Sequence, residues 1–116
     1  MSLIVQKFGG TSLGTGERLQ NVARIVQSGA TDHQPIVVVS AMSSYTKAEG
    51  TTSRLLEAGQ QALANGLFFR ILDLVEQAHF EALEQAIPDP EIQEEIREFV
   101  HQELQALKSF LNAIHV

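Results

Sequence analysis

The chain has 116 residues, of which 44% are hydrophobic and 19% charged, a composition that excludes a disordered or fibrous protein and fits one globular domain. It contains no cysteine, which excludes a disulfide scaffold, a zinc ribbon and a thiol nucleophile. Residues 1–58 hold five basic and four acidic groups and the remainder holds three basic and ten acidic ones, so an acidic second half argues against nucleic-acid binding.

The first 40 residues predict a strand, a helix and a second strand. Residues 3–8 are apolar and β-branched and end at a glycine pair, which predicts a strand followed by a turn. Residues 17–28 carry apolar side chains at helical spacing and stop at Gly29. After Pro35, the apolar run that opens residues 36–40 is typical of a strand covered on both faces. We therefore expect two adjacent parallel strands joined by a right-handed crossover.

The rest of the chain is helical in pattern after a polar loop. Pro88 and Pro90 must interrupt the pattern, because proline clashes with the preceding turn and lacks a backbone donor. Asp89 between them is the expected N-cap of the last helix, which carries one broad apolar stripe. The two long helices on either side of the prolines form a helical hairpin. The predicted helices are residues 54–64, 67–86 and 91–113.

These elements place the chain in the α/β class, as the N-terminal part of a three-layer α/β/α sandwich with a helical hairpin in its second half. Residues 1–56 are the expected βαβ part that binds phosphate and substrate, and residues 57–116 are the helical part. Two parallel strands are too few for an independent sheet. No helix stop signal precedes Val116. We therefore expect residues 1–116 to be the N-terminal part of a larger domain.

The glycine turn after the first strand is the strongest candidate site. Ligands of open α/β sheets bind beyond the carboxyl ends of the strands. Glycines allow the backbone to approach a ligand closely, and the amides of such a turn, with a helix N-terminus beside them, suit phosphate oxygens. The spacing also fits an ordinary strand and turn that binds nothing, so both interpretations stay open. The residues concerned are Lys7, Phe8, Gly9, Gly10, Thr11 and Ser12.

Two common phosphate-binding motifs are missing from the sequence. The chain has no Gly-Lys dipeptide, which excludes the P-loop. Gly14 and Gly16 begin a dinucleotide fingerprint, but Leu19 stands where its third glycine belongs.

The loop after the second strand is the second candidate. In a βαβ unit it lies beside the first loop, so Ser40 and Thr46 are expected to face the same ligand. For any single hydroxyl of this loop, a solvated turn is the alternative. Asp32 and His33 lie at the opposite end of the strand, and no two histidines have the i, i+4 spacing of a metal site.

The motif at residues 7–12, followed by Val37 to Met42, closely resembles the start of aspartokinases, members of the amino acid kinase superfamily. Residues 43–56 are similar to a subgroup that includes fungal members. The resemblance is strong over residues 3–56 and looser through the hairpin, where residues 103–113 also match.

The resemblance implies transfer of the ATP γ-phosphate to the side-chain carboxylate of L-aspartate. It implies that Lys7 stabilises the transferring phosphoryl group and that Gly9 to Ser12 hold ATP phosphates. It further implies that Ser40 lines the site and that Thr46 contacts aspartate. A carboxylate is already ionised at pH 7, so this reaction needs no general base. Mg²⁺ would arrive with ATP and be held mainly by its phosphates.

The remaining expectations concern partners and location. No apolar run reaches the roughly 18 residues of a membrane span, and no signal peptide is evident, so the expected location is the cytoplasm. A homo-oligomer, or association with the remainder of the kinase, is expected. Aspartokinases have a kinase domain of roughly double this length, so we expect the isolated chain to be inactive. Two alternatives stay open: a non-catalytic interaction module that docks through its acidic hairpin, and another carboxylate or carbamate kinase of the superfamily.

Overall fold

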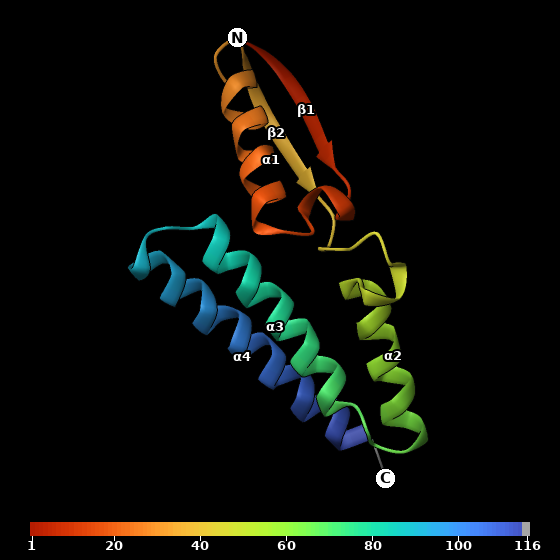
Figure 1. Ribbon diagram of the computed structural model, residues 1–116. Coiled ribbons are helices and arrows are strands. Elements are labelled where there is room, and N and C mark those ends of the chain that lie inside the picture. Colours follow the sequence, from red (N-terminus) through yellow and green to blue (C-terminus); the bar gives the residue numbers. More distant parts are fainter. Residues whose placement is uncertain (115–116) are drawn as a thin grey trace.

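A computed structural model describes residues 1–114, which form an elongated molecule of 55 × 28 × 23 Å (Figure 1). A βαβ unit occupies one end, and three helices occupy the other. This arrangement of a parallel sheet with helices confirms the α/β class. The elements are β1 (Ser2–Phe8), a 3-10 helix η1 (Gly10–Leu13), α1 (Gly16–Gly29), β2 (His33–Val39), η2 (Lys47–Glu49), α2 (Thr51–Ala64), α3 (Phe69–Ala86) and α4 (Pro90–Ile114).

The sheet consists of β1 and β2, which pair in parallel from Ser2 opposite His33 to Phe8 opposite Val39. Parallel pairing is confirmed, and both candidate loops leave the same end of the sheet. The second strand begins at His33 and so includes Pro35, which was expected to precede it. Both strands of a two-stranded sheet are edge strands. An edge strand can contain a proline, because the missing amide donor can face solvent there.

One face of the sheet is covered by α1 and the other is open. The side chain of Gln6 reaches Gly29 of α1, where a Cβ would lie 3.1 Å from its amide nitrogen. The alternate residues Leu3 and Val5 point to the other face and remain about two-thirds exposed. Residues 36–39 are 42–58% exposed. The expected cover on both faces of β2 is therefore absent within the described residues, which supply only one layer of helix on the sheet.

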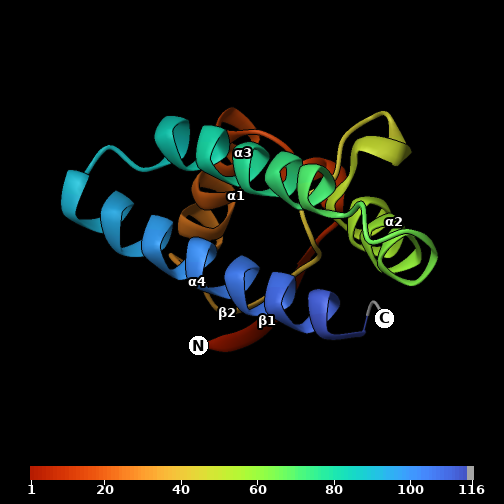
Figure 2. The same ribbon diagram turned by 90° about the horizontal axis from the view of Figure 1, so that it is seen from below.

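The main hydrophobic core lies among α2, α3 and α4. Phe68 and Leu72 are fully buried there, against the apolar sides of α2 and α4. In Figure 2, α3 and α4 run side by side in opposite directions with α2 next to α3, which confirms the helical hairpin. The apolar stripe of α4 is broader than the hairpin can cover, because Phe99 stays 64% exposed. The buried residues of this core are Ala58, Ala62, Phe68, Leu72, Val75, Leu104 and Leu111.

The helix ends follow local capping chemistry. Thr15 caps α1 by accepting a hydrogen bond from the Arg18 amide at 3.2 Å, and the Asp89 side chain accepts from the Glu91 amide at 3.0 Å, as predicted for α4. The second helix begins at Thr51, three residues earlier than predicted, because Gly50 serves as its N-cap without a side-chain cap. Only Gly66 adopts a positive φ among the described residues, in the turn before α3. Residues 115–116, beyond α4, lie outside the described residues.

The βαβ unit docks on the helices through the N-terminus of α1. Gly16 is buried, and a Cβ there would lie 2.2 Å from the Cβ of Gln85 in α3. The Gly16 amide donates to Gln85 Oε1 at 3.2 Å, and Gln20 donates to the Gln85 carbonyl at 3.0 Å. A glycine at this position lets α1 approach α3 closely. No helix of the described residues is long and apolar enough to cross a membrane.

Candidate functional site

The first loop presents unpaired backbone amides at the carboxyl end of β1. The chain turns at Gly9 into η1, where the Ser12 amide donates to the Gly9 carbonyl at 3.1 Å. Within the described residues, the amides of Gly9, Gly10 and Thr11 donate to no protein acceptor. Three free amides in succession are suited to the oxygens of an anionic ligand.

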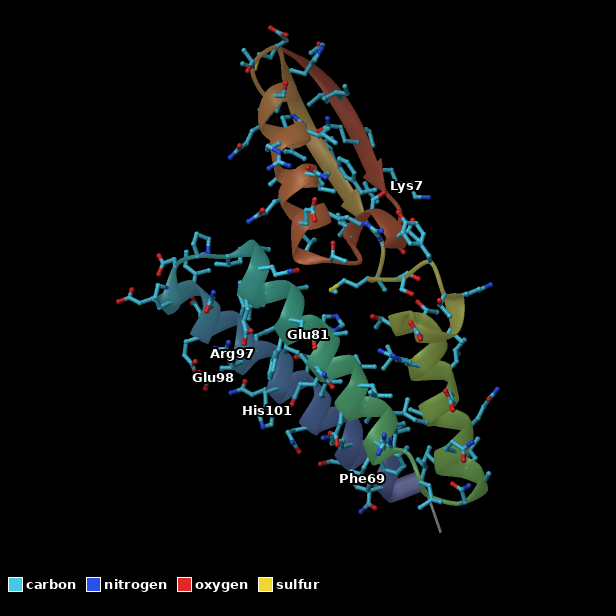
Figure 3. All side chains as sticks on the ribbon, viewed as in Figure 1. Lys7, Phe69, Glu81, Arg97, Glu98 and His101 are labelled. Carbon is cyan, nitrogen blue, oxygen red and sulfur yellow. The ribbon has the colours of Figure 1, made fainter. Side chains whose placement is uncertain are left out.

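Lys7 and Phe8 leave β1 on opposite faces of the sheet. Phe8 is half-buried on the face that α1 covers. Lys7 is exposed on the open face, at the loop end of the strand, and projects away from the ribbon in Figure 3. Its ammonium forms no hydrogen bond or ion pair with any of residues 1–114. The charge is therefore free to reach a ligand at the end of β1.

The second loop packs directly against the first. The Ser40 amide donates to the Phe8 carbonyl at 3.2 Å, and the Ser43 amide donates to the Gly10 carbonyl at 3.0 Å. A Cβ on Gly10 would lie 2.6 Å from the Ala41 carbonyl oxygen. Gly10 is thus required by the close approach of the two loops.

Both loops and the start of α2 enclose an open pocket of about 650 Å³. The pocket brings together three of the predicted site residues: Gly10, Thr11 and Ser40. Lys7, Phe8, Gly9, Ser12 and Thr46 are outside its lining. The lining residues are Gly10, Thr11, Ser40, Ala41, Ser43, Ser44, Tyr45, Lys47, Gly50, Thr52, Ser53 and Leu56.

Thr46 has a structural role in the loop backbone. It is exposed, its amide donates to Ser44 Oγ at 2.9 Å, and its carbonyl accepts from the Glu49 amide at 2.9 Å. These bonds shape the turn into η2 and hold the Thr46 backbone outside the pocket lining.

The sequence analysis named three of the lining residues and missed the others, among them Lys47, Thr52 and Ser53. Among the residues that the structure describes, Lys47 is the only charged one in the lining. Within the described residues, the amides of Thr52 and Ser53 donate to no protein acceptor, because they occupy the first turn of α2. A signal was available, since a glycine followed by three hydroxyl residues precedes the apolar pattern of this helix. Placing the helix start at residue 54 obscured it.

The pocket is built to receive an anion with more than one oxygen. Its free amides come from the first loop and from the first turn of α2, its hydroxyls include those of Ser40, Thr52 and Ser53, and among the described residues its lining carries one full charge, the positive charge of Lys47. No carboxylate of residues 1–114 lines it. In the described chain no three His, Cys, Asp or Glu side chains come together as metal ligands.

The model of the amino acid kinase family matches residues 2–113. The aspartokinase of Saccharomyces cerevisiae is 40% identical over 117 residues, which cover 97% of this chain and 22% of the yeast protein. The aspartokinase of Schizosaccharomyces pombe is 36% identical with the same coverage. The aspartokinase of Helicobacter pylori strain 26695 is 56% identical over 59 residues, half of this chain. The chain thus spans about a fifth of the length of the fungal relatives.

Proposed function

Since the chain belongs to the amino acid kinase family, we propose that it carries the phosphate-binding and aspartate-binding loops of an aspartate kinase. The proposed reaction transfers the γ-phosphate of ATP to the side-chain carboxylate of L-aspartate and gives 4-phospho-L-aspartate. The observation that carries this proposal is the hydrogen bond from the Ser43 amide to the Gly10 carbonyl, 3.0 Å long. It holds a loop with free amides beside a hydroxyl-rich loop, so that two anionic substrates can meet between them.

The chemistry of the pocket supports a carboxylate as the phosphoryl acceptor. A carboxylate is ionised at pH 7, so the protein does not have to remove a proton from it. Catalysis then depends on alignment and on neutralising negative charge. A lining with free amides, hydroxyls and Lys47, and without a carboxylate, meets both needs.

On the nucleotide side, we assign the amides of Gly9, Gly10 and Thr11 and the Ser12 hydroxyl to the ATP phosphates. Lys7 is assigned to the transferring phosphoryl group, because its unpaired ammonium lies on a flexible stem at the end of β1. Mg²⁺ is proposed to enter with ATP and to be held by phosphate oxygens and water, since the lining offers no carboxylate to bind it directly.

On the amino-acid side, Ser40 lines the proposed site, and two threonines compete for the contact with aspartate. Thr46 is the residue that the resemblance implies. Thr52 is the residue whose position supports the role, because it lines the pocket together with Ser53 at the start of α2. Both assignments enter the tests below. A cytoplasmic location and a homo-oligomeric assembly complete the proposal.

The interaction-module alternative is less well supported. Three acidic groups of the hairpin meet a lysine or arginine within the chain: Glu84 and Glu94 contact Arg97 at 3.5 and 3.2 Å, and Asp73 contacts Lys108 at 3.0 Å. These pairs reduce the negative charge left to recruit a partner. The relatives that match 97% of the chain are named aspartokinases.

A chimera tests the proposal. Residues 2–113 replace the matching segment of the yeast aspartokinase, and ADP release is measured with and without L-aspartate. We expect aspartate-dependent turnover, and we expect Lys7→Ala to lower kcat by about 10²-fold with little change in the KM for ATP, because the ammonium meets charge that develops mainly in the transition state.

Lys108→Ala is the matched control, since this lysine pairs with Asp73 in the hairpin and should leave turnover unchanged. A chimera that melts cooperatively yet releases no ADP with aspartate would contradict the proposal. Turnover with a different carboxylate or carbamate as acceptor, and none with aspartate, would favour the other kinases of the superfamily.

A further inference from the structure

The guanidinium of Arg18 links the two loops at a point that the proposed reaction does not use. Arg18 is half-buried in the first turn of α1, and its amide is fixed by the Thr15 cap at 3.2 Å. Its Nη1 donates to the Thr11 carbonyl at 3.0 Å, which ties it to the first loop. Its Cζ lies 4.1 Å from the centroid of the Tyr45 ring, which ties it to the second loop.

A guanidinium can make both contacts at once. It donates hydrogen bonds in its plane and presents its face to an aromatic ring, whereas an ammonium is a compact point charge. Tyr45 is 83% exposed, and among the described residues its ring interacts with the Arg18 guanidinium alone. The Arg18 clamp, defined as Arg18 with the Thr11 carbonyl and the Tyr45 ring, therefore bridges the two loops.

The clamp stands at the wall of the proposed substrate pocket. Thr11 and Tyr45 line that pocket, and together with Arg18 they also line a second, smaller pocket of about 250 Å³. The bond to the Thr11 carbonyl fixes the peptide that follows the free Thr11 amide. The stacked ring fixes the loop segment that carries Ser43 and Ser44 into the lining.

We propose that Arg18 is a positioning residue that holds the phosphate-binding loop and the substrate-binding loop at a fixed distance through Thr11 and Tyr45. The expected effect of Arg18 on catalysis rests on the proposed function, whereas the existence of the clamp does not. Arg18 touches neither the free amides nor the pocket hydroxyls, so it acts through the loops. Losing the clamp should misalign the substrates more than it weakens the binding of either one.

The clamp can be tested without any activity, because Tyr45 is the only tyrosine and the chain has no tryptophan. Amide and aromatic NMR spectra are recorded for the chain, at a concentration at which sedimentation shows a monomer, with Arg18→Ala, Tyr45→Ala, Tyr45→Phe and the double alanine variant. We expect Tyr45→Ala to shift the Thr11 and Ser12 amides when Arg18 is present and to leave them unmoved in the Arg18→Ala background. Tyr45→Phe keeps the ring face and should leave these amides near their original positions.

Arg24→Ala is the matched control, since Arg24 lies six residues further along α1 and its guanidinium donates to Asn21 Oδ1 on the same helix. It should move neither the Tyr45 ring signals nor the Thr11 amide. Equal shifts of the Thr11 amide with and without Arg18, or none in either background, would overturn the clamp.

The catalytic arm uses the yeast chimera. Arg18→Ala and Tyr45→Ala should each lower kcat about tenfold, the double variant should lose no more than either single one, and Tyr45→Phe should retain turnover. Additive losses, or an effect confined to the melting temperature, would overturn the positioning role. If the unsubstituted chimera shows no turnover, the proposed function fails, while the NMR comparison still decides whether the clamp exists.

Discussion

The contact between the two loops at Gly10 predicts that alanine substitutions at Gly10 and at Gly9 have opposite effects on the stability of the chain. A Cβ on Gly10 would meet the Ala41 carbonyl oxygen at 2.6 Å and the Ser43 Cβ at 2.8 Å, where ordinary contact begins at 3.4 Å. Because the first of these atoms is backbone, the second loop has to retreat by roughly 0.8 Å. That movement breaks the bond between the Ser43 amide and the Gly10 carbonyl, now 3.0 Å long.

The cost of Gly10→Ala combines a lost hydrogen bond with local overpacking and comes to about 2 kcal/mol. For a chain of this length, we expect a fall in the melting temperature of about 8 °C. Gly9 is the control: nothing lies within 4 Å of its added Cβ, and its φ of −74° and ψ of 169° suit any residue. Gly9→Ala should be neutral or should stabilise by about 0.4–1 kcal/mol, because it restricts the unfolded chain.

The assay combines thermal melts of the two variants with hydrogen exchange at the Ser43 amide. In Gly10→Ala this amide should exchange much faster than in the parent chain, and in Gly9→Ala at an unchanged rate. Variants that melt at the same temperature, or a Ser43 amide that stays protected in Gly10→Ala, would refute the close packing of the loops.

Three further predictions follow from the geometry. In the chimera, we expect Thr52→Val to raise the KM for aspartate by about tenfold or more and to leave the KM for ATP unchanged. If Thr46→Val alone has this effect, the assignment made from the resemblance is the correct one. Gly16→Ala should cost about 2–3 kcal/mol by forcing α1 away from Gln85, whereas Gly59→Ala, on an open helix surface, should stabilise by up to about 1 kcal/mol. The isolated chain should self-associate through the open sheet face and show no aspartate-dependent turnover, which sedimentation and an ADP assay will check; an active, cooperative monomer would contradict this.

Much of the fold could be predicted because it depends on local pattern. The apolar run before Gly9, the periodic residues 17–28 and the proline pair around Asp89 each determine an element without reference to the rest of the chain. The free amides after β1 also follow from local sequence, since a glycine turn at the carboxyl end of a strand leaves them unpaired.

The pocket lining could not be predicted in the same way. Which hydroxyls face inward depends on the path of residues 40–50, and that path is determined by contacts with Gly10 and Gly14 of another loop. The stacking of Arg18 on Tyr45 joins residues 27 positions apart, and no periodicity predicts it. The open face of β2 could not be predicted. A continuous apolar run indicates that a strand favours burial on both faces, but it does not show that a second layer is present to cover them.

The placement of the core has a consequence for the order in which the chain becomes ordered. The βαβ unit, which carries the first candidate loop, precedes α2, α3 and α4 in the chain, yet the core cluster lies in these three helices and at Phe68, directly before α3. The hairpin of α3 and α4 forms through contacts between residues near one another in sequence, and such contacts form quickly. The contact of α1 with α3 joins Gly16 to Gln85, 69 positions later, and can form only after Gln85 has been made. During synthesis we therefore expect the first candidate loop to be made before the core helices but to become ordered only after α3 has been made. The two candidate loops are thus the part of this chain that local opening should release most readily, while the core of α2, α3 and α4 stays folded.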